Sequence, residues 1–153
     1  MAIVQSSGSG KTRLVGELRN KGVYILYICK RHENNSGYPT STPLVNQIFG
    51  TIRDCKFGVL LSSALKVIKK NNWNEEEFWN IQIKLEHKEK CNCFWKDVFE
   101  TLKQDKSSSD CSNKNFVKEL FSNKEICAVC CIDEAHELLT KIKGGEAYFI
   151  KWK

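Results

Sequence analysis

Two uninterrupted apolar runs constrain the fold of this chain more than any other feature. Residues 23–29 read Val-Tyr-Ile-Leu-Tyr-Ile-Cys, and residues 126–132 read Ile-Cys-Ala-Val-Cys-Cys-Ile. Runs of this length, rich in β-branched and aromatic residues, are typical of strands buried on both faces, as in parallel sheets covered by helices. We therefore expect an α/β fold in which both runs are strands.

The segment before the first run completes a βαβ unit. Residues 2–4 are apolar and continue directly into residues 5–12, Gln-Ser-Ser-Gly-Ser-Gly-Lys-Thr. Residues 11–20 then follow a helical pattern, which Asn20-Lys21-Gly22 ends. The expected apolar side of that helix carries Leu14, Val15 and Leu18. The opening thirty residues thus predict strand, loop, helix and strand.

The loop between the expected strand and helix has the composition of a phosphate-binding loop. Gly8 and Gly10 let the backbone turn sharply and direct several N–H groups into one concavity. Lys11 can then reach the β- and γ-phosphates, and the Thr12 hydroxyl can bind Mg²⁺. We expect nucleotide contacts from Ser7, Gly8, Ser9, Gly10, Lys11, Thr12 and Arg13. The first glycine of the pattern G-x-x-x-x-G-K-[ST] is Gln5 here, which alters the start of the loop without closing it.

The second apolar run ends in two carboxylates, Asp133 and Glu134. In open α/β sheets the ligand lies outside the carboxyl ends of the strands, so Asp133 can hold the hydrated magnesium ion. Glu134 can orient or deprotonate an attacking water. The alternative is that both residues only cap the helix expected over residues 135–142.

Residues 5–12 and Ile132-Asp133-Glu134-Ala135-His136 resemble the Walker A and Walker B motifs of P-loop NTPases, in the branch with a glutamate after the Walker B aspartate. With the strand 23–29 and the segment 38–43, they are also similar to the NTPase module of Crinkler-type effector proteins. The resemblance implies binding of ATP or GTP with Mg²⁺ at Lys11, Thr12 and Asp133. It also implies hydrolysis in which Glu134 and Lys11 are the catalytic residues.

Residues 133–136 also spell the motif of DEAH helicases, but the further motifs of those proteins do not follow. A DEAH-type helicase fragment is therefore the weakest alternative. Nineteen residues follow Glu134, and no arginine follows Arg53, so we expect a core truncated after the Walker B strand that needs a protein partner or a missing C-terminal part.

The middle of the chain, about residues 43–121, reads as a helical insertion. Thr42 is expected to cap a helix that starts at Pro43, and a second helical pattern follows over residues 57–68. Asn74 and Glu77 form a capping box that favours a helix, although apolar residues from 79 to 85 alternate as in a strand. Residues 94–102 predict a further amphipathic helix.

Composition limits the possible partners. The net charge is +6, and residues 1–72 carry eleven Lys or Arg against three Asp or Glu. This positive surplus suits a nucleotide as ligand or, more weakly, a nucleic acid. The alternative is that the surplus forms only a solvated lysine-rich surface. No apolar run reaches the ~20 residues of a membrane span, and no secretory signal is evident, so we expect a cytoplasmic or nuclear chain without membrane contact. Disulfides and zinc are not expected. The cysteines 127, 130 and 131 are interpreted as small buried hydrophobes.

The sequence thus predicts a single domain over residues 1–153, a three-layer α/β P-loop NTPase core with a parallel sheet. The expected function is Mg²⁺-dependent binding of a nucleoside triphosphate, with ATP as the first candidate and GTP as the other, and slow hydrolysis of the β–γ phosphoanhydride. The alternative is a non-catalytic nucleotide-binding or interaction module, a fragment of a larger effector-type or STAND-like ATPase.

Overall fold

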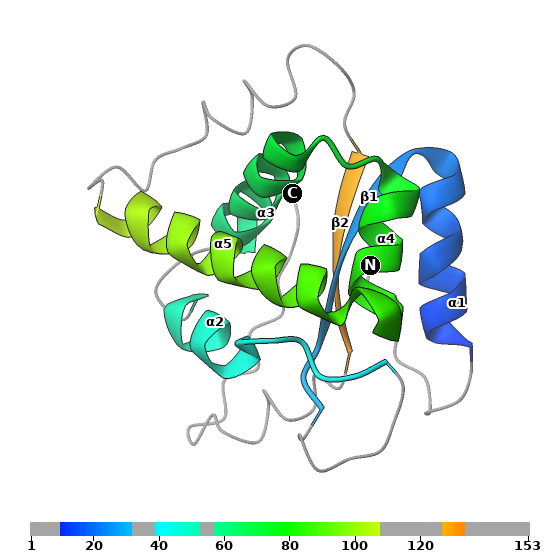
Figure 1. The fold of residues 1–153 in the computed structure, drawn as a ribbon, viewed down its shortest axis with the longest axis horizontal. Coiled ribbons are helices and arrows are strands. Elements are labelled where there is room, and N and C mark those ends of the chain that lie inside the picture. The colour runs from blue at the N-terminus through cyan, green and yellow to red at the C-terminus, as the bar shows by residue number, and fades with distance from the viewer. Residues whose placement is uncertain (1–9, 32–38, 53–56, 108–126, 134–153) are drawn as a thin grey trace, which may run out of the picture.

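The computed structural model describes residues 10–31, 39–52, 57–107 and 127–133 (Figure 1). Its elements are α1 (Lys11–Gly16), the 3₁₀ helix η1 (Glu17–Lys21), β1 (Val23–Cys29), α2 (Val45–Ile52), α3 (Phe57–Asn71), α4 (Glu75–Ile83), the 3₁₀ helix η2 (Leu85–His87), α5 (Lys88–Ser107) and β2 (Cys127–Asp133). The strand predicted over residues 2–4 and the helix predicted over residues 135–142 lie outside the described residues. Within the described residues, no helix combines the length and apolarity that crossing a bilayer requires.

The two apolar runs form neighbouring parallel strands. Val23 is opposite Cys127, and the register continues residue by residue until Cys29 is opposite Asp133. Both predicted strands are thereby confirmed, and their carboxyl ends lie at the same end of the sheet. The expected burial of Cys127 is wrong, because this residue begins β2 at the other end of the sheet and is exposed.

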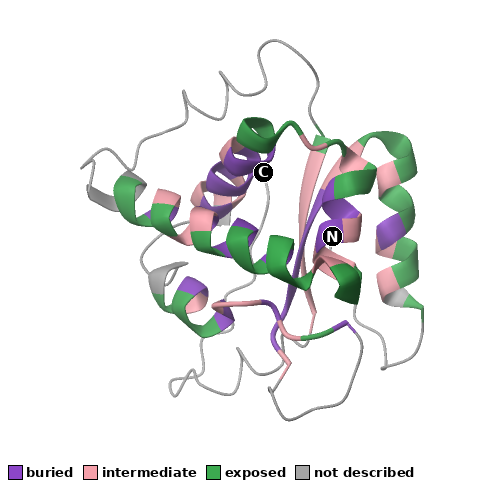
Figure 2. Ribbon diagram, viewed as in Figure 1, coloured by how far each residue is buried: buried purple, intermediate pink, exposed green. Residues whose placement is uncertain are grey.

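Helices cover both faces of the strand pair, as Figures 1 and 2 show. On one face, Ile25, Tyr27 and Cys29 pack with Trp79 of α4, and Val15 of α1 joins this cluster. On the other face, Leu26 and Ile28 belong to a larger core built with α2, α3 and α5. The fully buried side chains of that larger core include Ile48, Leu60, Phe94, Trp95, Val98 and Leu102.

The edge of β1 that faces away from β2 is closed by a side chain of α4. The Gln82 amide donates from Nε2 to the Ile25 carbonyl oxygen at 2.8 Å and accepts from the Tyr27 N–H at 2.9 Å. Gln82 therefore satisfies the same two backbone groups that a further strand would bond. At these two groups the edge is closed to pairing with a further strand.

Thr42 closes the next part of the same edge. Its hydroxyl accepts from the Cys29 N–H at 2.9 Å, and its own N–H donates to the Cys29 carbonyl oxygen at 2.9 Å. The predicted helix start at Pro43 is therefore wrong. Leu44 takes a positive φ of 58°, and α2 begins only at Val45, because the Thr42 hydroxyl is bonded to the strand and not to the helix.

Most other predicted helices are confirmed. Asn74 and Glu77 form the reciprocal capping box, and residues 75–83 are helical, so the alternating pattern from 79 to 85 does not make a strand. Of the predicted apolar side of α1, Val15 packs on the sheet, but Leu14 and Leu18 are 59% and 40% exposed, so the prediction is wrong for these two residues. The helix also approaches α4 closely at Gly16, where an added Cβ would lie 2.7 Å from the Trp79 ring.

Replacing Gln82 by Met tests the closure of the β1 edge. Gln82→Met keeps the length of the side chain but leaves the Ile25 carbonyl and the Tyr27 N–H without their partner. We expect a loss of about 1–3 kcal/mol in the free energy of unfolding, measured by urea denaturation. Gln47→Met, at an exposed position of α2, is the matched control and should change the free energy by less than about 0.5 kcal/mol. Equal stabilities of the two variants would contradict the bonding role of Gln82.

Two glycine-to-alanine substitutions test the close approach of α1 to α4. Both place alanine in a helix, which by itself stabilises by about 0.8–1.0 kcal/mol. Nothing lies within 4 Å of a Cβ at Gly50, so Gly50→Ala should raise the melting temperature. Gly16→Ala must displace the buried Trp79 ring, and overpacking of about 1–3 kcal/mol should lower the melting temperature. An increase in both variants would show that α1 does not pack tightly on Trp79.

Candidate functional site

A chain of hydrogen bonds joins three residues that are far apart in the sequence. Thr12 lies in the first turn of α1, Tyr27 lies in β1, and Asp133 is the last residue of β2. The Thr12 Oγ1 lies 3.2 Å from the Tyr27 hydroxyl oxygen, and that hydroxyl donates to Asp133 Oδ2 at 2.7 Å. Thr12 and Asp133, the metal ligands predicted from opposite ends of the sequence, therefore both contact Tyr27 at one end of the sheet.

The direction of these bonds follows from the proton inventory of a tyrosine. The single hydroxyl proton of Tyr27 is used toward Asp133, so the Thr12 hydroxyl is the donor to the Tyr27 oxygen. Among the described residues, both lone-pair sites of the Thr12 hydroxyl are left for other partners. The short distance to a carboxylate is typical of a charge-assisted hydrogen bond.

The strand register explains why Tyr27 reaches both neighbours. Tyr27 is opposite Cys131, so its side chain and that of Asp133, two residues further along β2, project from the same face of the sheet. α1 covers this face through Val15. The Tyr27 ring packs edge-on against Trp79, with ring centroids 5.8 Å apart and an interplanar angle of 83°. The ring is thus fixed, and its hydroxyl is directed toward the strand ends.

The Tyr27 hydroxyl keeps its proton across the physiological pH range. Burial raises the pKa of Tyr27 well above its usual range, and the neighbouring Asp133 carboxylate raises it further, while the hydrogen bond from Thr12 lowers it in part. Tyr27 is consequently a permanent donor to Asp133. It contributes no charge to the site.

Gly10 makes the turn into α1. Its φ of 75° and ψ of 13° lie in the left-handed region, which glycine adopts without steric cost. Its carbonyl accepts from the Leu14 N–H at 2.9 Å, so the helical bonding begins at this residue. The requirement for glycine here agrees with the sharp turn predicted from the sequence.

The remaining predicted site residues are only partly within the described residues. Lys11 begins α1, but its side chain lies outside what the structure describes. Arg13 is described and is exposed on α1. Ser7, Gly8, Ser9 and Glu134 lie outside the described residues. Thr12 and Asp133, the two predicted metal ligands, are brought together.

The chemistry of Thr12 and Asp133 fits a magnesium ion. A hydroxyl and a carboxylate are hard oxygen donors, and Mg²⁺ in nucleotide sites is held by one or two protein ligands, with phosphates and water completing the octahedron. Within the described residues, no group of three or more His, Cys, Asp or Glu side chains could hold a metal on its own. A site of two protein ligands therefore depends on the nucleotide for the rest of its coordination.

Sequence reasoning missed Tyr27. Tyr27 stands in an apolar run, where an aromatic residue indicates only burial. Its alignment with Asp133 depends on the strand register, which no local pattern reveals. Lys30, which directly follows the strand of residues 23–29, could by its place in the sequence also line the nucleotide groove. Lys30 is buried, and its ammonium lies 5.7 Å from the centre of the Phe49 ring in α2. It therefore lies on the opposite face of the sheet from the Thr12–Tyr27–Asp133 chain.

One comparison with known proteins gives a match. A family model described as a domain of unknown function, DUF8735, matches residues 1–149. No curated protein and no solved structure matches the chain. Because the family model covers nearly the whole sequence, the chain belongs to the DUF8735 family.

Proposed function

We propose that this chain binds the magnesium complex of a nucleoside triphosphate, ATP or GTP, at the end of the sheet where α1 begins. The observation that carries the proposal is the hydrogen-bonded chain from Thr12 through Tyr27 to Asp133, with distances of 3.2 and 2.7 Å. A phosphate-loop threonine and a strand-end aspartate are the two protein groups that magnesium needs beside a nucleotide. Here the Tyr27 hydroxyl is hydrogen-bonded to both groups.

Each residue of the proposed site has a distinct role. The backbone N–H groups of residues 8–12 surround the β- and γ-phosphates, and the Lys11 ammonium neutralises their charge. The Thr12 hydroxyl and the Asp133 carboxylate hold the metal. When bound, magnesium draws charge from the phosphate oxygens. Tyr27 keeps Asp133 oriented toward Thr12, as hydrogen bonds to metal-ligating carboxylates do elsewhere.

Hydrolysis of the β–γ bond depends on Glu134. In the proposed reaction its carboxylate orients a water in line with the γ-phosphate and accepts a proton from it, and Lys11 stabilises the charge on the departing oxygens. The resemblance to P-loop NTPases belongs to the same proposal. It is supported by the parallel pairing of β1 with β2 and by the helices on both faces.

Direct titration tests the proposed binding. We expect labelled ATP to bind more tightly in the presence of Mg²⁺ than in EDTA, and Lys11→Ala to weaken binding at least tenfold through loss of the charge on the phosphates. Lys21→Ala, at the exposed end of η1, is the matched control and should bind as the parent does. Asp133→Asn should remove most of the magnesium dependence. Equal affinity of the Lys11→Ala and Lys21→Ala variants would contradict the proposed site.

A turnover assay on the same samples separates an enzyme from a non-catalytic module. Glu134→Gln should retain ATP and release no phosphate if the chain hydrolyses ATP. Tight binding of ATP with no phosphate release by the parent chain would instead assign it to the non-catalytic class. That result would leave the binding site as proposed and remove the catalytic role of Glu134.

Replacing Tyr27 by Phe tests the positioning of Asp133. Tyr27→Phe keeps the ring against Trp79 and removes the hydroxyl that donates to Asp133. We expect the Mg²⁺ concentration for half-maximal ATP binding to rise about tenfold, the usual effect of losing a hydrogen bond to a metal ligand. Tyr24→Phe removes a hydroxyl that donates to the Trp73 carbonyl at 3.1 Å, on the same strand, and should leave the magnesium requirement unchanged. A magnesium requirement that is the same in the parent and in both variants would show that Tyr27 does not position Asp133.

A further inference from the structure

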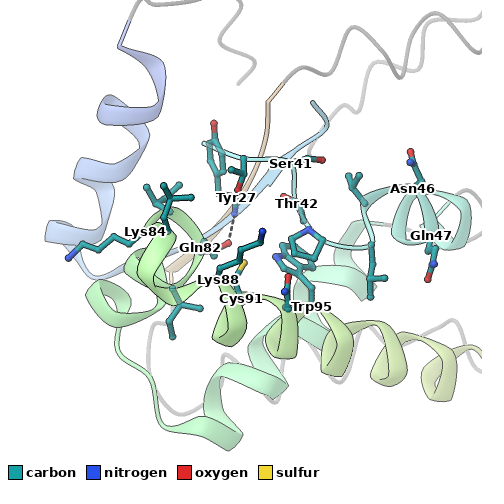
Figure 3. A pocket seen from close by; sticks show the side chains of 18 residues that line it. Tyr27, Ser41, Thr42, Asn46, Gln47, Gln82, Lys84, Lys88, Cys91 and Trp95 are labelled. Atoms are coloured by element: carbon teal, nitrogen blue, oxygen red, sulfur yellow. Dashed lines mark hydrogen bonds between the residues drawn. The ribbon is translucent and has the colours of Figure 1, made fainter. Parts of the chain in front are cut away.

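A cavity of about 490 Å³ opens beside the closed edge of β1. Its walls come from the segment 40–47, from the end of α4 with η2, and from the first turns of α5 (Figure 3). Its volume lies within the range of about 300–1,000 Å³ that is typical of small-molecule sites. Gln82, which bonds to β1, forms part of its wall.

Part of the cavity wall is apolar and buried. Ile81, Cys91 and Trp95 line the cavity and are each exposed by less than a tenth. Trp95 is fixed against Phe94, with ring centroids 5.1 Å apart. At the mouth, the Leu85 side chain is 63% exposed and adds apolar surface. These side chains can therefore cover an aromatic or aliphatic group of a bound ligand on several sides.

The charged side chains that line the cavity are positive. Among the described residues that line it there are two lysines, Lys84 and Lys88, and no aspartate or glutamate. Figure 3 shows the Lys88 side chain extending into the cavity toward the segment of Ser41 and Thr42, whereas Lys84 extends away from it. The Lys84 ammonium also lies 4.0 Å from Glu86, outside the cavity. Lys88 is thus the cation that can meet a ligand inside.

Exposed polar side chains complete the wall. Asn46, Gln47 and Asn92 line the cavity and are exposed, and Figure 3 shows the Asn46 and Gln47 side chains extending from α2 away from Lys88. Lys88 is therefore the group that would meet an anion, and the buried apolar side chains of the wall offer surface to an apolar body. An inorganic anion would leave the apolar part of the wall uncovered, and a neutral hydrocarbon would leave Lys88 unpaired.

We propose that this cavity binds a small organic anion, a carboxylate, sulfonate or phosphate ester with an aromatic or aliphatic body. The anionic group bonds Lys88, and the body lies against Trp95, Ile81 and Leu85. This site is separate from the magnesium and nucleotide site, and the proposal does not depend on that function. Tyr27 borders both regions, since it lines the cavity and donates its hydroxyl to Asp133.

The fluorescent sulfonate 8-anilinonaphthalene-1-sulfonate and its neutral analogue N-phenyl-1-naphthylamine test the proposal on the full chain. We expect saturable binding of the sulfonate at one site and binding of the neutral analogue at least tenfold weaker. Lys88→Ala should weaken sulfonate binding about tenfold by removing the ion pair. Lys90→Ala, exposed on α5 and not lining the cavity, should leave it unchanged. Near-UV circular dichroism confirms that each variant keeps its packed core, since a loosened core also binds this dye.

Three results would overturn the proposal. Equal binding of the two dyes would show that the charge of Lys88 contributes nothing. Equal sulfonate affinity in the Lys88→Ala and Lys90→Ala variants would place the dye elsewhere. Loss of sulfonate binding in Lys11→Ala would place it in the nucleotide site. Failure of ATP to bind the parent chain, with dye binding intact, would reject only the nucleotide proposal.

Discussion

Tyr27 holds together three elements that pack around the end of the sheet. Its N–H donates to Gln82 of α4, its ring packs on Trp79, and its hydroxyl connects Thr12 of α1 with Asp133 of β2. A buried hydroxyl without partners is destabilising, so the position of Thr12 and Asp133 and the packing of the ring depend on one another. The proposed metal ligands are therefore set by the same contacts that fix α4 against the sheet.

The edge of β1 that faces away from β2 is closed by side chains rather than by a further strand. Gln82 bonds the Ile25 carbonyl and the Tyr27 N–H, and Thr42 bonds both backbone groups of Cys29, so a further strand could not form the regular ladder along this edge. Closing the edge with two side chains, rather than with a strand, also leaves space beside it. The cavity lies in that space, with Gln82 and Thr42 in its wall. Edge protection and the cavity thus have a common structural origin.

Local chemistry explains which elements could be predicted from the sequence. The two strands follow from composition, and α4 follows from the capping box of Asn74 and Glu77, whose bonds are made within four residues. The start of α2 was predicted wrongly because the Thr42 hydroxyl can accept a hydrogen bond in two ways. It can accept from an N–H group at a helix start or from an N–H group at a strand edge. In the structure it accepts from the N–H of Cys29 at the strand edge, thirteen residues away in the sequence. Apolar spacing likewise placed Leu14, Val15 and Leu18 on one side of α1, but only Val15 packs on the sheet, and the close approach of Gly16 to Trp79 has no signal in that spacing.

The two candidate sites differ in how far a sequence can reveal them. Thr12 and Asp133 stand in motifs because phosphate and magnesium chemistry requires particular groups next to a loop and a strand end. Tyr27 stands in no motif, because its role comes from the register that aligns it with Cys131, two residues before Asp133. Lys88 and Trp95 are ordinary members of an amphipathic helix, and only the backbone turn at Leu44 and the end of α4 create a cavity beside them. A site that is formed by tertiary packing leaves no local pattern, so it has to be found in the structure.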